Sequence, residues 1–172
     1  MDILIVVDMQ NDFISGALGT NEAKLIVEKV REKTENFEGL IFFTRDTHFE
    51  DYMETQEGKK LPVPHCIKNT WGWEICDELK DLSENTEICD KPTFGSTDLM
   101  ESIKELSLEE DIKSITLMGL CTDICVISNA MLLKAALPEV KIIVDSTCSA
   151  GVTPESHKNA LEAMKMCQIE IV

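Results

Sequence analysis

Short, unbroken apolar segments alternate with amphipathic segments along the chain, and this alternation constrains the fold more than any other feature. The first apolar run, Ile3–Val7, has no polar residue at alternate positions, which is typical of a strand buried on both faces of a parallel sheet. The predicted strands are Ile3–Val7, Leu40–Thr44, Glu87–Asp90, Ser114–Met118, Lys141–Val144 and Ile169–Ile171. Strands that alternate with helices predict an α/β fold, with three layers (α/β/α) and a six-stranded, mostly parallel, Rossmann-like sheet.

One helix is expected between each pair of consecutive strands. Thr20 can cap the first one, and Thr153 followed by Pro154 indicates where the last one begins. The predicted helices cover about 21–34, 73–82, 99–106, 122–136 and 154–166. Residues 46–72 lack helical periodicity, so we expect an irregular segment there. A length of 172 residues predicts a single domain over 1–172.

The charge balance narrows the classes of partner. The chain has 16 basic and 32 acidic residues, a net charge of −16, which disfavours binding to nucleic acid or to anionic membranes. No segment has the roughly 18 apolar residues of a membrane span, and the N-terminal apolar run lacks the basic lead of a signal peptide. We therefore expect a cytoplasmic protein whose seven cysteines are reduced.

Polar side chains follow four of the predicted strands. Asp8 follows the first strand, Asp46 and His48 follow the second, Lys91 follows the third, and Cys125 lies one turn beyond the fourth. Taken singly, each of these residues is more often structural than functional. Ligands of open α/β sheets bind beyond the carboxyl ends of the strands, so their shared sheet edge predicts a functional site.

Cys125 is the candidate nucleophile of that site. If Thr122 caps the following helix, Cys125 occupies its third position, where backbone N–H groups and the helix dipole favour a thiolate. Lys91 would lower the pKa of the thiol further, and Asp8 could accept its proton and return it to a leaving amine. The backbone N–H groups of Cys121 and Cys125 could bind an oxyanion. This trio predicts acyl transfer through a thiol nucleophile.

Asp46, His48 and His65 form a candidate metal site. One carboxylate and two imidazoles suit Zn²⁺, Fe²⁺ or Mn²⁺, with water completing the coordination. From the spacing alone, a hydrogen-bonded loop without a metal is an equally good interpretation. Glu54 or Glu57 could add a further ligand, although either is more often a solvated charge. The third histidine, His157, is expected at the surface or in a local hydrogen bond.

Five segments carry a family resemblance, in order, over nearly the whole chain. They are VVDMQNDF at 6–13, TRDTH at 44–48, PHC at 64–66, KPTFGS at 91–96 and GLCTDICV at 119–126. Together they resemble the isochorismatase-like cysteine hydrolases, among which the nicotinamidases/pyrazinamidases are the most similar characterised type. The resemblance implies that Asp8, Lys91 and Cys125 are a catalytic triad. It also implies a cis peptide bond between Leu120 and Cys121 that turns the Cys121 N–H into the oxyanion hole.

The resemblance also implies a metal and a substrate-binding ring. Nicotinamidases hold a divalent metal with residues that match Asp46, His48 and His65, and Phe13 matches the residue that packs on the substrate ring. They often carry a tryptophan three residues before the second metal histidine, where this chain has Pro62. Trp71 or Trp73 could substitute for that tryptophan.

The leading functional hypothesis is an amidase that converts nicotinamide to nicotinate and ammonia through a thioester, as in NAD salvage. The alternative within the same family is another small amide, ureido or carbamoyl substrate. A remote alternative is a non-enzymatic receiver-like signalling domain, which would need no activated cysteine. The implied partner is a small-molecule amide, and a homo-oligomer remains open because the family includes dimers and larger assemblies.

Overall fold

A six-stranded parallel sheet forms the centre of the computed structural model, which describes residues 1–172. The strands are β1 (Asp2–Val7), β2 (Leu40–Asp46), β3 (Glu87–Lys91), β4 (Ser114–Leu120), β5 (Lys141–Ala150) and β6 (Glu170–Ile171). Their order is β3-β2-β1-β4-β5-β6, and every neighbouring pair is parallel. The predicted α/β fold with a six-stranded parallel sheet is confirmed.

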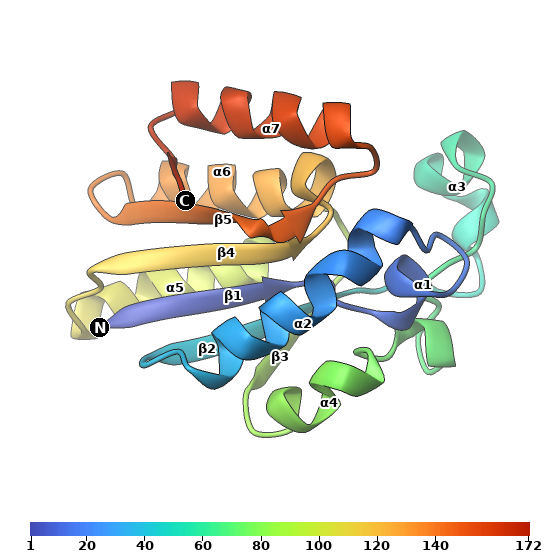
Figure 1. The fold of residues 1–172 in the computed structure, drawn as a ribbon, viewed down its shortest axis with the longest axis horizontal. Helices are drawn as coiled ribbons and strands as arrows, with labels where there is room; N and C mark the ends of the chain where they lie inside the picture. The colour runs from blue at the N-terminus through green and yellow to red at the C-terminus, as the bar shows by residue number, and fades with distance from the viewer.

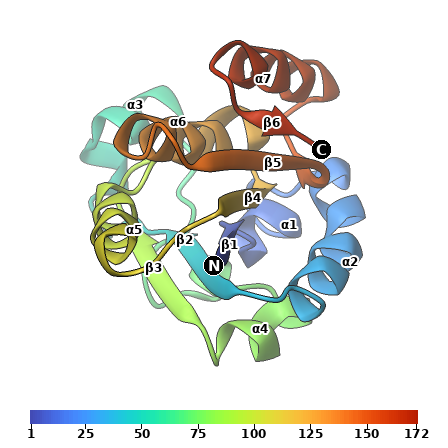
Figure 2. The same cartoon turned by 90° about the vertical axis from the view of Figure 1, so that its left-hand side faces the viewer.

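Helices cover both faces of this sheet (Figures 1 and 2). They are α1 (Asn11–Ile14), α2 (Asn21–Glu35), α3 (Gln56–Lys60), α4 (Asp77–Ser83), α5 (Thr97–Glu109), α6 (Ile127–Ala136) and α7 (Pro154–Met166). Viewed along the strands, α1, α2 and α4 lie on one side and α5 and α6 lie on the other (Figure 2). α7 packs beside α6 and against β6. None of the helices has the length and apolar character needed to cross a membrane.

The central strand β1 shows why the sheet needs helices on both sides. Its alternate residues Ile3, Ile5 and Val7 join the apolar cluster under α5, α6 and α7. Leu4 and Val6 join the opposite cluster, under α2 and α4. All five side chains are fully buried, as a strand without polar alternation predicts.

Several element boundaries differ from the sequence-based expectation. The predicted helix over 73–82 begins only at Asp77, because Trp71–Trp73 forms a 3₁₀ turn. The irregular segment over 46–72 contains α3, which Thr55 caps through the backbone N–H of Gly58. β5 extends to Ala150, beyond the expected end, after a register shift against β4.

The carboxyl ends of β1 and β4 approach each other closely at Gly119. This glycine has φ +117°, and a Cβ atom there would lie 2.2 Å from the carbonyl oxygen of Val7. Only a glycine fits this position without displacing β1. The close approach brings the segments that follow the two strands together.

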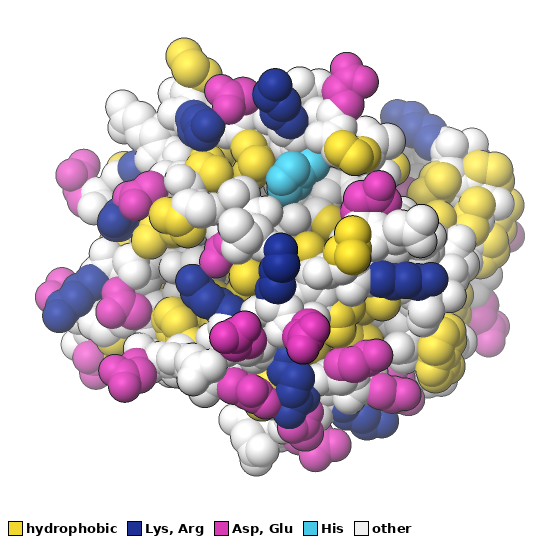
Figure 3. All heavy atoms as spheres, viewed as in Figure 1, with side chains coloured by type: hydrophobic (Ala, Val, Ile, Leu, Met, Phe, Trp, Pro, Cys, Tyr) yellow, Lys and Arg dark blue, Asp and Glu magenta, His cyan; other side chains and the backbone are white.

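Elsewhere on the molecule, acidic and basic side chains are interspersed over the face in Figure 3.

Candidate active site

The sheet brings the predicted site residues to one edge. Asp8 directly follows β1, while Asp46 and Lys91 are the last residues of β2 and β3 and lie opposite each other in the strand register. Cys125 lies in the turn after β4. Since β1 lies between β2 and β4, these side chains converge from four strands on one place.

An acid and an amine that are both fully buried meet there with a buried thiol that reaches the pocket. Lys91 Nζ lies 2.7 Å from Asp8 Oδ2 and 3.4 Å from Cys125 Sγ. It also donates a hydrogen bond to Thr93 O at 3.2 Å. The hydroxyl of Thr44, on β2, donates to Asp8 Oδ1 at 2.6 Å. The amine of Lys91 therefore touches both the acid and the thiol, and the hydroxyl of Thr44 fixes the orientation of the acid.

The charges around this cluster shift each pKa. Burial raises the pKa of Asp8 against the opposing effect of Lys91. Burial alone would lower the pKa of Lys91, but the negative charges of Asp8, Cys125 and Asp46 outweigh it and raise that pKa. The expectation of an acidic thiol is wrong for the free protein, because burial, followed by the charge of Asp8, raises the pKa of Cys125 well above its usual value. Lys91 opposes this shift but shares its charge with two carboxylates.

The turn that carries Cys125 also differs from the expected helix cap. Thr122–Val126 forms a π-helical turn with Cys121, rather than Thr122, at the N-cap position, and α6 begins at Ile127. The hydroxyl of Thr122 is instead hydrogen-bonded to His157 Nδ1, at 2.8 Å. His157 was expected at the surface or in a local hydrogen bond, but it is half-buried and bonds to a residue 35 positions away.

The peptide bond between Leu120 and Cys121 is cis, as the resemblance implied. The backbone N–H of Cys121 donates no hydrogen bond to another backbone group or to a side chain of the protein. Cys121 and Cys125 both line the same pocket. An unpaired N–H beside the thiol can donate a hydrogen bond to a substrate oxygen on which negative charge develops.

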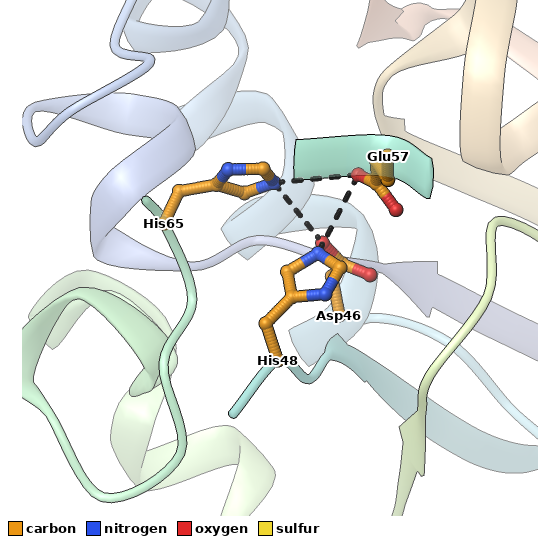
Figure 4. Close-up of side chains that lie close together, drawn as sticks. All are labelled: Asp46, His48, Glu57 and His65. Carbon is orange, nitrogen blue, oxygen red and sulfur yellow. Dashed lines mark ion pairs between the residues drawn. The ribbon is translucent and has the colours of Figure 1, made fainter. Parts of the chain in front are cut away.

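A second cluster adjoins the first and has the composition of a metal site. The ligand atoms of Asp46, His48, Glu57 and His65 lie within 4.8 Å of one another, and their side chains point toward a common centre (Figure 4). Glu57, on α3, therefore joins the three expected residues, and Glu54 does not. Lys91 Nζ lies 3.6 Å from Asp46 Oδ1 and links the two clusters.

The geometry of this group fits a divalent cation. His48 Nε2 lies 3.0 Å from Asp46 Oδ2 and 3.5 Å from Glu57 Oε1, and His65 Nε2 lies 3.5 Å from Asp46 Oδ2. Ligands about 2.0–2.1 Å from a tetrahedral zinc are separated by roughly 3.3 Å. His48 Nε2 is buried without a hydrogen bond, and His65 Nδ1 lies 2.8 Å from Val63 O, which leaves Nε2 of His65 free for a metal.

The pocket above these clusters has a volume of about 510 Å³. Phe13 lines it, as the resemblance implied. Trp71 does not, and its side chain is 56% exposed. Trp73 is also outside the pocket, because its indole N–H donates to Thr47 Oγ1 at 2.8 Å and Arg45 stacks on its ring. The expectation that Trp71 or Trp73 lines the substrate pocket is therefore wrong. The other apolar residues that line the pocket are Leu18, Leu61, Pro92, Phe94 and Ile124.

Thr44 was missed by sequence reasoning. It lies on β2, two residues before Asp46, and is fully buried. Residues two apart on a strand share a face, so a polar residue in this register was the available signal.

A three-layer α/β chain whose pocket is lined by a thiol and a metal-type group, with a buried acid and amine packed against that thiol, has the architecture of a hydrolytic enzyme. The family model of the isochorismatase domain matches residues 2–172, so the chain belongs to the isochorismatase family. It is 25% identical to a nicotinamidase of Saccharomyces cerevisiae over 100% of this chain and 99% of that protein.

Two solved structures extend the comparison. A pyrazinamidase of Pyrococcus horikoshii in complex with zinc is 30% identical, with a TM-score of 0.82, over 99% of this chain and 98% of that one. A pyrazinamidase/nicotinamidase of Streptococcus mutans is 26% identical, with a TM-score of 0.85, over the whole of both chains. Both structural similarities therefore extend over nearly the whole chain.

Proposed function

We propose that this protein is an amidohydrolase that converts nicotinamide to nicotinate and ammonia, with Asp8, Lys91 and Cys125 as its catalytic residues. The observation that carries the proposal is the position of Lys91, whose Nζ touches both the buried acid and the buried thiol. The nicotinamidases and pyrazinamidases among its relatives support the substrate class. The family membership disfavours the receiver-like alternative.

The first half of the reaction forms a thioester. The thiol proton of Cys125 passes to Asp8 as the sulfur attacks the amide carbon, because the high pKa of the free thiol requires a base beside it. The Cys121 N–H binds the resulting oxyanion. Asp8 then returns the proton to the leaving nitrogen, so ammonia departs and the acyl group stays on the sulfur.

The second half reverses these proton transfers. Asp8 takes a proton from a water that attacks the thioester carbon, and the thiolate leaves and regains a proton. One water is consumed, and one carboxylic acid and a free thiol are produced. Throughout, Lys91 keeps its positive charge beside the acid and the sulfur and stabilises whichever of them is negative.

Asp46, His48, Glu57 and His65 would hold a divalent metal, with zinc the first choice because the Pyrococcus relative is in complex with zinc. Bound there, the ion would supply a Lewis-acid centre that orients a nitrogen-containing ring and water molecules. Phe13 would pack on one side of that ring. The ring centroid of Phe13 lies 5.6 Å from that of His65, so the Phe13 ring and the metal group face the same part of the pocket.

Because no tryptophan lines the pocket, a second class of substrate is a candidate for the same reaction. A pocket with Leu18 and Leu61 among its lining residues also suits a small ureido, carbamoyl or aliphatic amide. The triad would act on such a substrate in the same way.

The test is ammonia release from nicotinamide by the purified protein after zinc loading. We expect release by the wild type and none by Cys125→Ser. Cys148→Ser is the matched control, since Cys148 is another buried cysteine but does not line the pocket. Release from a ureido substrate alone would select the second candidate. Release by Cys125→Ser equal to that of the wild type would contradict the proposal.

A further inference from the structure

Asp12 carries a half-buried carboxylate that has no part in the proposed mechanism. It lies on α1, four residues after Asp8, and its Oδ2 accepts a hydrogen bond from the backbone N–H of Cys66 at 2.8 Å. Its Oδ1 accepts from Ala17 N at 3.2 Å. Asp12 therefore joins the segment that follows β1 to the segment that carries His65.

Cys66 is the residue through which this contact reaches both histidines. It directly follows His65, and its carbonyl oxygen accepts a hydrogen bond from the backbone N–H of His48 at 2.9 Å. Cys66 has φ +48°, a left-handed conformation that few non-glycine residues adopt. A backbone in this region persists only where its surroundings hold it, and the carboxylate of Asp12 supplies that hold at the N–H.

The packing around Asp12 is built to admit its carboxylate. Gly72 lies so close that a Cβ atom there would be 2.0 Å from Asp12 Oδ2. Any larger residue at this position would displace the carboxylate from Cys66. A different residue holds the third ligand, because the Gln10 side chain accepts from Asp46 N and donates to Asp46 O, both at 2.8 Å.

We propose that Asp12 is a positioning residue of the metal site, which fixes His48 and His65 together by holding the backbone of Cys66. The inference rests on the metal site of the proposed function. It assigns no ligand role to Asp12. Loss of its carboxylate leaves a buried N–H without an acceptor and allows the 65–66 backbone to leave its left-handed conformation. Both imidazoles then lose the alignment that places their Nε2 atoms at one centre.

The experiment measures zinc affinity by chelator competition on Asp12→Ala, Asp12→Asn and Gly72→Ala. We expect Asp12→Ala to bind zinc about 10–100-fold more weakly, the usual cost of losing an outer-shell partner of a ligand. Asp12→Asn keeps one oxygen for Cys66 N–H and should retain most of the affinity. Gly72→Ala changes neither a ligand nor Asp12 itself, but its Cβ atom would displace the Asp12 carboxylate, so this variant should reproduce the weakening.

The matched control is Asp145→Ala. Asp145 Oδ1 also accepts hydrogen bonds from backbone N–H groups, those of Thr147 and Cys148, but it lies on β5 away from the metal group. We expect this variant to lose thermal stability and keep its zinc affinity. Equal affinity in Asp12→Ala and the wild type, or an equal loss in Asp145→Ala, would overturn the proposal.

A readout without metal separates this inference from the proposed function. The imidazole nitrogen resonances of His48 and His65 in the metal-free protein should shift in Asp12→Ala and Gly72→Ala, and stay unchanged in Asp145→Ala. A wild type that binds no zinc would remove the metal assignment, and the resonances would still decide the positioning role. Unchanged resonances in Asp12→Ala would overturn it.

Discussion

Lys91 and Asp8 form an ion pair with no exposed surface, with Nζ 2.7 Å from Oδ2 and both side chains at 0% exposure. Two charges are stable in such a place only as a pair, because each alone carries an uncompensated desolvation cost. The pair is therefore a structural requirement of this sheet edge as well as the proposed chemical centre. The same cation also lies against the thiol, at 3.4 Å.

Removal of this cation should destabilise the fold. Lys91→Met leaves Asp8 buried without its partner, and we expect the free energy of unfolding to fall by about 3–5 kcal/mol. Urea denaturation measures the change. The control is Lys80→Met, which removes an exposed pair with Glu74 at 3.2 Å and should cost less than about 1 kcal/mol. Similar losses in the two variants would show that the buried pair has no special role.

The hydroxyl that orients Asp8 gives a second prediction. Thr44→Val preserves the shape of the side chain but removes the hydrogen bond to Asp8 Oδ1, and a bond to a charged group contributes about 1.5–3 kcal/mol. The matched control is Thr116→Val on β4, which lies on the other side of β1 from β2, since Thr116 is also buried and its hydroxyl has no such carboxylate partner. Thermal unfolding should separate the variants, and equal melting temperatures would contradict the contact.

Zinc should stabilise the protein through His65 and not through His157. A ligand that binds only the folded state adds about 2.7 kcal/mol at a concentration 100 times its Kd, so the melting temperature of the wild type should rise with added zinc. His65→Ala removes one of the four grouped residues and should abolish the rise. His157→Ala should retain it, because His157 bonds to Thr122 instead. An equal response in both variants would argue against the metal site.

In the protein without substrate or metal, the thiol of Cys125 should ionise at a higher pH than an ordinary cysteine. Its pKa is raised well above the usual value by burial and by the charge of Asp8, so the neutral thiol persists as the pH rises through the range where an ordinary cysteine ionises. The alkylation rate of Cys125 by iodoacetamide, followed by mass spectrometry, should still be increasing when that of glutathione has levelled off. A midpoint below that of glutathione would contradict this assignment and would favour a preformed thiolate.

The parts of the fold that depend on local pattern were predictable from the sequence. The run Ile3–Val7 is apolar at every position, and it forms the central strand because both faces of that strand are covered. The last helix begins where Thr153 and Pro154 indicated, with a side-chain cap from Thr153. The sheet edge could be predicted in the same way, since strand ends in a parallel sheet meet there.

The predictions that were wrong or left open concern residues whose positions depend on contacts between distant segments. Thr122 was expected to cap its own helix, but its hydroxyl bonds to a histidine 35 residues away. The Trp73 indole is held by Thr47, so a tryptophan that could have lined the pocket faces elsewhere. The choice of Glu57 over Glu54 depends on the short helix α3, whose place beside the histidines no local pattern encodes.

The central claim is that the sulfur of Cys125 carries the acyl group during turnover. The direct measurement is acid quenching of the zinc-loaded protein during steady-state reaction with nicotinamide, followed by mass spectrometry of the intact chain and its peptides. We predict one nicotinoyl group on the peptide that contains Cys125, and none in Cys125→Ser. Ammonia release by the wild type without any acyl adduct, together with undiminished release by Cys125→Ser, would contradict the account.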